Sequence, residues 1–174
     1  MSTKKTIISF AVIVLSVFFV NHLFAQEKKE RVSPPSKVSA NVAGSNIEIN
    51  YGQPSVKGRK IWGELVPYNK VWRTGANEAT TFETSIDIKV EDVLLPAGKY
   101  ALFTIPGENE WTFIFNKTAS QWGSFKYDEK QDQLRIKVKP LKTSALQEQL
   151  AFYIENSKVI LRWEYLEAGF KISK

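Results

Sequence analysis

The sequence predicts an all-β fold, a single antiparallel β-sandwich of about eight strands for which a jelly roll is one candidate strand order. Three observations predict this fold. Apolar and polar residues alternate with a period of two in many short segments, turn-forming residues separate these segments, and no long window has the periodicity of an amphipathic helix. The 174 residues, of which 43% are hydrophobic, are enough for one domain with a packed core.

The N-terminus has the pattern of a secretory signal peptide. Lys4 and Lys5 precede an apolar run from Ile7 to Val20, and the small residue Ala25 precedes a charged segment. The apolar run is shorter than the roughly 18 residues that a membrane-spanning helix usually needs. We therefore expect a signal peptide at 1–25 and an exported product, periplasmic or secreted, without a stable membrane span after cleavage. Retention of this segment as an uncleaved anchor is the alternative.

The segment 26–37 reads "QEKKERVSPPSK" and combines charged residues with a proline pair, which predicts a flexible tether. The period-two alternation begins at Val38, so we place the β-sandwich domain at 38–174. Its first hairpin joins residues 38–42 to 47–51. We expect further strands near residue 82 and at 86–90, 99–105, 111–116, 134–138, 150–155 and 159–166. Buried faces are predicted for Trp111, Phe113 and Phe115, and for Val159, Leu161 and Trp163.

Composition excludes several classes of enzyme. The only histidine is His22, inside the predicted signal peptide, and the chain has no cysteine. Without residues 1–25 it cannot form a Ser-His-Asp triad, a Cys-His dyad or a zinc site of ordinary ligand type. Removing them also lowers the net charge from +6 to +4, with no clustered basic stripe. We expect no nucleic-acid partner, no cofactor and no metal; a solvated turn is favoured over a calcium site at Asp128, Glu129 and Asp132.

The connection between Tyr51 and Phe82 is the most unusual segment of the sequence. It holds 30 residues, whereas loops longer than about 12–15 residues in a compact domain are usually functional or disordered. Its many apolar residues argue against disorder, because they can bury surface on the sandwich. A second irregular segment, 121–133, contains Trp122, Gly123 and Tyr127, which are candidates for the wall of a pocket beside the connection.

The residues from 57 to 78 carry the candidate binding site. Five basic and two acidic residues lie there, and three glycines allow close backbone approach. Arginine forks bind carboxylates or phosphates, and tryptophan rings offer flat faces to a sugar. The ligand-binding candidates are Lys57, Arg59, Trp62, Trp72, Arg73, Asn77 and Glu78. If they form a site, all of them except Arg73 are expected to converge on one concavity.

A structural interpretation of the same residues stays open. In that interpretation Arg73 is substantially buried and ion-paired with Glu78, while Trp62 and Trp72 fill the core. The cation would then serve to hold the long connection in place.

Three classes of function remain. The absence of histidine and cysteine favours an exported, non-catalytic binding domain for a glycan, an anionic small molecule or an envelope protein. The first alternative is a carboxylate-dependent hydrolase such as a glycosidase, in which Glu78 would pair with Glu64 or Glu83. The second alternative is a structural or assembly component of the cell envelope.

Several motifs are shared with one family. They are "KGRKIWG", "LVPY", "KVWRTGANEAT", "LPAGKY", "FTIPG" and "QWGSFKYD". On these motifs the chain resembles the domain of unknown function family 2911 from about Ser33 to Lys174. The resemblance implies an exported, β-rich single domain and implies no reaction.

Overall fold

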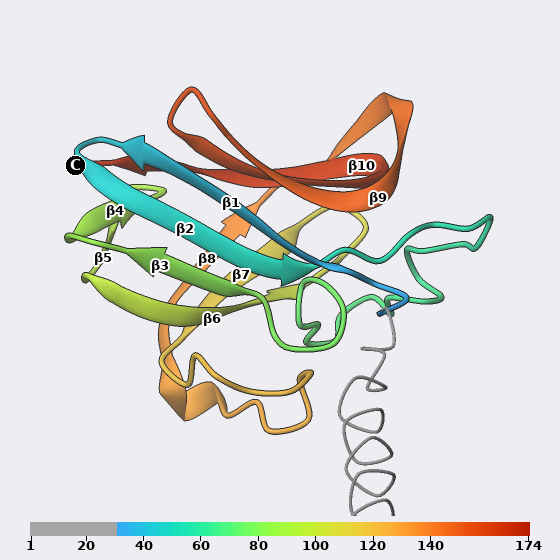
Figure 1. The fold of residues 1–174 in the computed structure, drawn as a ribbon, viewed down its shortest axis with the longest axis horizontal. Helices are drawn as coiled ribbons and strands as arrows, with labels where there is room; N and C mark the ends of the chain where they lie inside the picture. The colour runs from blue at the N-terminus through green and yellow to red at the C-terminus, as the bar shows by residue number, and fades with distance from the viewer. Residues whose placement is uncertain (1–30) are drawn as a thin grey trace, which may run out of the picture. The chain divides into compact units, whose positions relative to one another are not determined.

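The computed structural model describes residues 31–174, which fold into two antiparallel β-sheets (Figure 1). The predicted signal peptide at 1–25 and the first residues of the predicted tether lie outside the described residues. Val32–Lys174 forms one compact unit. Within residues 31–174, no helix is both long enough and apolar enough to cross a membrane. The prediction of an all-β sandwich is confirmed.

The larger sheet contains six strands. Their spatial order is β1 (Pro35–Val42), β2 (Ser45–Gly52), β3 (Thr81–Thr84), β6 (Gly98–Ile105), β7 (Trp111–Asn116) and β8 (Asp132–Val138). All neighbours in this order pair antiparallel. The strands follow one another along the chain, except that β4 and β5 leave for the second sheet. This order is a meander with one excursion, and it differs from the two Greek keys of a jelly roll.

The smaller sheet contains four strands. Their order is β5 (Val93–Leu95), β4 (Ile88–Val90), β10 (Lys158–Ser173) and β9 (Leu141–Glu155). Figure 1 shows the long β9–β10 hairpin lying across the larger sheet. Two features escaped the sequence pattern: β5 is only three residues long, and β9 begins well before the expected residue 150. The first half of β9 is mostly exposed, so no apolar face marks it in the sequence.

The end of the predicted tether is part of the larger sheet. β1 begins at Pro35, which pairs with Gly52, and its ladder to β2 continues to Val42. β1 is an edge strand, and an edge position tolerates a proline because one side of the strand donates no ladder hydrogen bonds. The strand therefore begins inside the segment 26–37, before the alternation becomes visible at Val38.

Short two-residue turns set the register of three hairpins. Both turn residues have positive φ in each case: Ala43 and Gly44, Glu91 and Asp92, and Asn156 and Ser157. Two positive φ values are the mark of the type I′ turn, whose twist matches that of the strands it joins. The β1–β2 turn brings Val42 opposite Ser45, which confirms the predicted first hairpin.

The core lies between the two sheets. Trp111, Phe113 and Phe115 on β7 are fully buried, as their alternation predicts. Phe170 of β10 meets Phe113 and Phe115 with ring centroids 5.1 and 5.5 Å apart, which joins the two layers. Val159, Leu161 and Trp163 on β10 are likewise buried and share the inner face, as predicted.

A smaller apolar cluster lies apart from this core and is built around Phe103 on β6 and Ile114 on β7. The chain between β7 and β8 runs across this cluster and includes a short 3-10 helix, Glu129–Gln131. Tyr127 from that segment packs its ring 5.1 Å from the ring of Phe103. The segment between β7 and β8 is therefore tied to the sheet rather than left in solvent.

Candidate functional site

The connection between β2 and β3 packs its two tryptophans into the core. Trp62 and Trp72 are 7% and 8% exposed. The ring of Trp62 lies 4.8 Å from that of Trp111 and 5.7 Å from that of Trp163, and the ring of Trp72 stacks on that of Trp163 at 6.0 Å. We call these four residues the tryptophan cluster. Because the rings cover one another, neither Trp62 nor Trp72 presents an open face on which a sugar could stack.

A close backbone contact positions the segment that follows Trp72. A Cβ atom at Gly52, the last residue of β2, would lie 2.2 Å from the carbonyl oxygen of Ala76. A Cβ atom at Gly75 would lie 3.0 Å from the carbonyl oxygen of Gly52. Only glycine lets two backbones approach so closely. The glycine of the "TGAN" motif therefore has a structural role, which is to seat the loop against the end of β2.

The backbone of Thr74, the residue after Arg73, is strained. Thr74 is fully buried and has a φ of 58°, a conformation that costs a β-branched residue roughly 1–3 kcal/mol. Its hydroxyl lies 3.2 Å from that of Thr104, and its carbonyl accepts a hydrogen bond of 2.9 Å from the Thr80 hydroxyl. The Thr80 amide closes the loop by donating to the Arg73 carbonyl at 3.1 Å. Strain held by surrounding packing is typical of functional loops.

A cavity of about 360 Å³ opens at the tryptophan cluster. Three cationic side chains line it, Lys57, Arg59 and Arg73, together with the rings of Trp72 and Trp163. Among the residues that the structure describes, no acidic side chain lines this cavity. We call it the basic cavity. It brings together four of the seven binding candidates, whereas Trp62, Asn77 and Glu78, which were expected to converge with Lys57, Arg59 and Trp72, do not line it.

Arg73 is partly buried, and its Nε is buried without a hydrogen-bond partner among residues 31–174. Burial lowers the pKa of the guanidinium from its ordinary value, but an arginine stays charged at neutral pH. The predicted ion pair with Glu78 is wrong, because the two side chains line different cavities and no ion pair joins them. Within the described chain, Arg73 is a desolvated cation without a counter-charge.

The other two cations lie at the exposed rim of the basic cavity. The guanidinium of Arg59 donates hydrogen bonds to the backbone carbonyls of Ser55 and Val56, which fix its position without cancelling its charge. The backbone amide of Lys57 donates to a carboxylate oxygen of Glu148 at 2.9 Å. Glu148 itself does not line the cavity.

The remaining candidates lie elsewhere. Asn77 donates from its side-chain amide to the carbonyl of Ser33 at 3.1 Å, and so ties the chain before β1 to the loop. Trp62 lies inside the tryptophan cluster and does not line the basic cavity. Glu78 is exposed and faces a second cavity. Gly75 and Ala76 line the first cavity and Glu78 and Ala79 the second, so one loop forms a wall of both.

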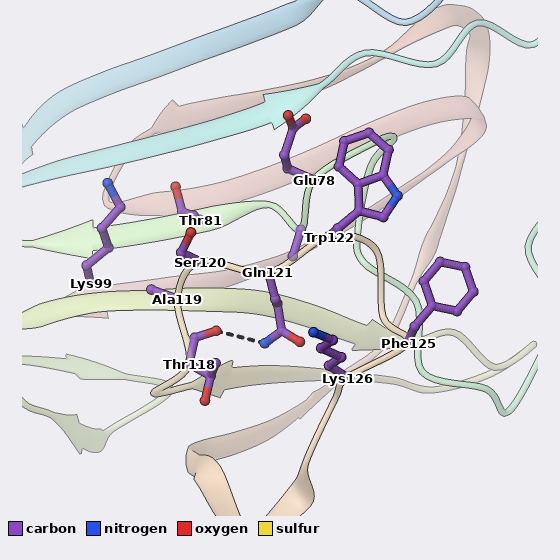
Figure 2. A pocket seen from close by; sticks show the side chains of 11 residues that line it. Glu78, Thr81, Lys99, Thr118, Ala119, Ser120, Gln121, Trp122, Phe125 and Lys126 are labelled. Carbon is purple, nitrogen blue, oxygen red and sulfur yellow. Dashed lines mark hydrogen bonds between the residues drawn. The ribbon is translucent and has the colours of Figure 1, made fainter.

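The second cavity, of about 880 Å³, is bounded by the segment after β7 and by the sheet (Figure 2). Trp122 and Phe125 line it and are 58% and 87% exposed. The polar part of the lining includes Glu78, Lys99 and Gln121. We call it the aromatic cavity. Of the three residues predicted to wall a pocket beside the connection, Trp122 lines this cavity, whereas Gly123 does not and Tyr127 packs on the sheet.

The carboxylates proposed for a hydrolase do not gather at either cavity. Glu64 is ion-paired with Lys60 at 3.1 Å, and Glu83 is ion-paired with Lys99 at 3.2 Å. Neither Glu64 nor Glu83 lines the basic or the aromatic cavity. Glycoside hydrolysis requires two carboxyl groups that face one cleft. The described lining of each cavity thus offers no such pair.

The acidic residues between β7 and β8 bind partners of their own chain. Asp132 accepts hydrogen bonds from Asn116, Tyr127 and Arg135, and Glu129 lies 3.2 Å from the guanidinium of Arg135. Asp128 accepts from the amide of Lys130 and caps the 3-10 helix. Residues 31–174 contain no group of three or more histidine, cysteine or acidic side chains that could hold a metal ion.

Sequence reasoning missed three contributors to these cavities. Trp163 lies on β10 and reaches the basic cavity only because the two sheets pack together. Gly52 reveals its role only when its distance from Ala76 is known. Phe125 had a usable signal, since it follows Trp122 and Gly123 in a segment without strand periodicity.

Comparison with known proteins identifies the family. Residues 33–172 match the model of the family described as a protein of unknown function (DUF2911). The chain belongs to this family. The match covers all ten strands except the last residue of β10, and both cavities of the DUF2911 domain lie almost wholly inside it. No curated protein and no solved structure matches the chain.

Proposed function

We propose that the protein is an exported, non-catalytic binding domain that takes an anionic small molecule in the basic cavity. One observation carries the proposal: the buried Nε of Arg73 has no partner among the described residues, in a cavity with three cations and no lining carboxylate. Burying a cation without a counter-charge costs free energy. An anion bound in the cavity would offset that cost.

The charged groups in the described lining of the basic cavity are all cationic, namely the side chains of Lys57, Arg59 and Arg73. A carboxylate or a phosphate supplies acceptor oxygens only, and the planar fork of an arginine matches either group. The chemistry of the lining therefore favours an oxyanion over a neutral or cationic ligand.

The size of the cavity limits the ligand. Small-molecule sites usually have volumes of about 300–1,000 Å³, and the basic cavity, at about 360 Å³, lies near the lower end. The rings of Trp72 and Trp163 form a rigid apolar wall next to the cations. A compact carboxylate or phosphate metabolite fits this combination of size, charge and wall.

Binding without catalysis follows from the groups that are present. Among residues 31–174, the lining of the basic cavity contains no histidine, cysteine or carboxylate, which are the side chains that most often transfer protons or attack a substrate. Cations and aromatic rings can hold and orient an anion but supply no general base at neutral pH.

Isothermal titration calorimetry of the purified protein with inorganic phosphate, citrate and a set of sugar phosphates tests the proposal. At least one of these anions should bind, with an affinity that falls as salt is added. Arg73→Met keeps the length of the side chain and removes its charge, so it should weaken binding at least about tenfold.

Lys70→Ala is the matched control. It removes one positive charge from the same connection, but Lys70 is exposed and does not line the basic cavity. Its affinity should stay within about twofold of the parent. The proposal fails if none of the anions binds, or if Arg73→Met binds as tightly as the parent.

A further inference from the structure

We infer that the aromatic cavity is a separate binding site for a neutral saccharide. The inference does not depend on an anion in the basic cavity, because the two cavities share a wall but no lining residue. The observations that carry it are two exposed aromatic rings on an anchored segment and three hydroxyl-bearing residues in the same lining.

The backbone that carries the exposed rings is anchored to the loop beside the cavity. The amide of Ala79 donates to the carbonyl of Gln121 at 3.0 Å, and the amide of Gly123 donates to the carbonyl of Asn77 at 3.1 Å. These two bonds flank Trp122 and fix its backbone to the loop that forms the cavity wall. Phe125 lies against Gly123, where an added Cβ atom would come within 3.0 Å of its ring. Binding to such rings costs little conformational entropy.

The polar lining adds an acceptor that lacks a donor. Gln121 donates from its Nε2 to the carbonyl of Thr118 at 2.7 Å, a bond that fixes the orientation of the amide (Figure 2). Its Oε1 is buried and accepts no hydrogen bond from the described residues. Hydroxyl groups of Thr81, Thr118 and Ser120 belong to the same lining. A ligand rich in hydroxyl groups can exchange hydrogen bonds with these side-chain hydroxyls.

The described lining carries charges of both signs. Glu78 contributes a carboxylate, and Lys99 and Lys126 contribute ammonium groups, of which that of Lys99 is ion-paired with Glu83 at 3.2 Å. This mixture contrasts with the three cations of the basic cavity and does not favour an ion of either sign. A neutral ligand with one apolar face and several hydroxyl groups, such as a sugar ring, combines both features of the lining.

An extended peptide is a poorer occupant. Peptides that add a strand need an unpaired sheet edge, but the sheet residues of this lining, Thr81 and Lys99, lie on β3 and β6. Both strands are hydrogen-bonded to a neighbour on each side. A peptide that lies on this face could contact side chains but could not form backbone hydrogen bonds with β3 or β6.

The tryptophans of the chain make a direct test practicable. All five lie in the described residues, and Trp122 is the exposed one, since the members of the tryptophan cluster are at most 8% exposed. Acrylamide quenching of tryptophan fluorescence therefore reports mainly on Trp122. Neutral trisaccharides of glucose, mannose and N-acetylglucosamine are the probes. We expect at least one of them to protect the fluorescence of the purified protein from quenching.

Calorimetry with the protecting trisaccharide then locates the site. Trp122→Ala and Phe125→Ala should each weaken binding at least about tenfold, and Gln121→Met should weaken it by a smaller factor. Tyr165→Ala is the matched control, because Tyr165 is an exposed aromatic residue, 50% accessible, that lies outside the cavity. Arg73→Met should leave saccharide binding unchanged, which separates this inference from the proposed anion site.

The inference is overturned if none of the trisaccharides protects Trp122 at millimolar concentration. It is also overturned if binding survives both Trp122→Ala and Phe125→Ala, since the sugar would then lie elsewhere. Protection by a short apolar peptide, without protection by any trisaccharide, would assign the cavity to a protein partner instead.

Discussion

The two cavities differ in the side chains that line them. The described lining of the basic cavity contains three cations, Lys57, Arg59 and Arg73, whereas that of the aromatic cavity contains two exposed rings, Trp122 and Phe125, and charges of both signs. Cations match an anionic group, and exposed rings match a ligand with an apolar face. The comparison teaches that the composition of one loop does not determine the character of a cavity, because the same loop forms a wall of both.

The tryptophans of the two regions differ in their exposure to solvent. Trp62 and Trp72 stand in a conspicuous basic stretch and are buried, while Trp122 stands in an inconspicuous turn and is 58% exposed. Both segments lack strand periodicity. The two segments differ in the surface on which they pack. The connection between β2 and β3 covers the end of the core at Trp111 and Trp163. The segment between β7 and β8 crosses a face of the larger sheet that the smaller apolar cluster already fills.

The largest expected effect tests this difference between the tryptophans. Trp62→Ala should lower the free energy of unfolding by about 3–5 kcal/mol, because it leaves a cavity where three other indole rings meet. Trp122→Ala should change it by no more than about 0.5 kcal/mol. Urea denaturation of both variants measures the two values. Equal losses would contradict the assignment of one ring to the core and the other to a binding surface.

The next effect concerns the wall that the two cavities share. Gly52→Ala should cost about 3 kcal/mol, since the new Cβ would meet the Ala76 carbonyl oxygen at 2.2 Å and push the loop away from β2. Gly58→Ala is the control: φ is +67° there, but no atom lies within 4 Å, so only a backbone penalty of about 1 kcal/mol remains. Thermal denaturation compares the pair, and an equal loss at both sites would argue against the backbone contact.

A smaller change in the free energy of unfolding, in the opposite direction, is expected for substitution of Arg73. In the absence of an anion, Arg73→Met should leave the free energy of unfolding unchanged or raise it by up to about 1 kcal/mol, because it removes a desolvated cation whose Nε has no partner. The predicted pairing with Glu78 would have required a loss of about 2 kcal/mol or more. Denaturant titration in an anion-poor buffer decides between the two, and a loss of that size would indicate a structural partner for Arg73.

The smallest effect depends on pH and concerns Tyr127, beside the aromatic cavity. Burial, followed by the hydrogen bond that its hydroxyl donates to Asp132, raises the pKa of Tyr127 to about 12. The fold thus favours the neutral phenol, so this contribution to stability is complete below the ordinary pKa of about 10 and is lost as the pH rises towards 12. Tyr127→Phe should be less stable than the parent by about 1 kcal/mol near neutral pH.

The stability difference between parent and Tyr127→Phe should then shrink between pH 10 and about 12. Denaturation at a series of alkaline pH values measures it, and the ultraviolet absorbance of tyrosinate follows the titration directly. A difference that stays constant over this range would show that the phenol of Tyr127 titrates normally.

The sequence by itself determined the architecture, because strand periodicity and turn chemistry are local properties. The alternation at Val38–Val42, the burial of Trp111, Phe113 and Phe115, and the hairpin turn at Gly44 were all legible without coordinates. The sequence pattern did not predict the exposed half of β9 or the three residues of β5. In both, the two faces of the strand do not differ clearly in polarity. The sequence also indicated that the long connection between β2 and β3 was packed against the domain.

The tertiary structure alone decided which side chains form a site. Lys57, Arg59 and Arg73 meet Trp163, a residue far along the chain, only because β10 packs behind the connection. Arg73 and Glu78 are near in sequence but face different cavities, since the Gly75–Gly52 contact turns the loop between them. Which side chains line a cavity depends on how the layers pack, and no local pattern of residues contains that information.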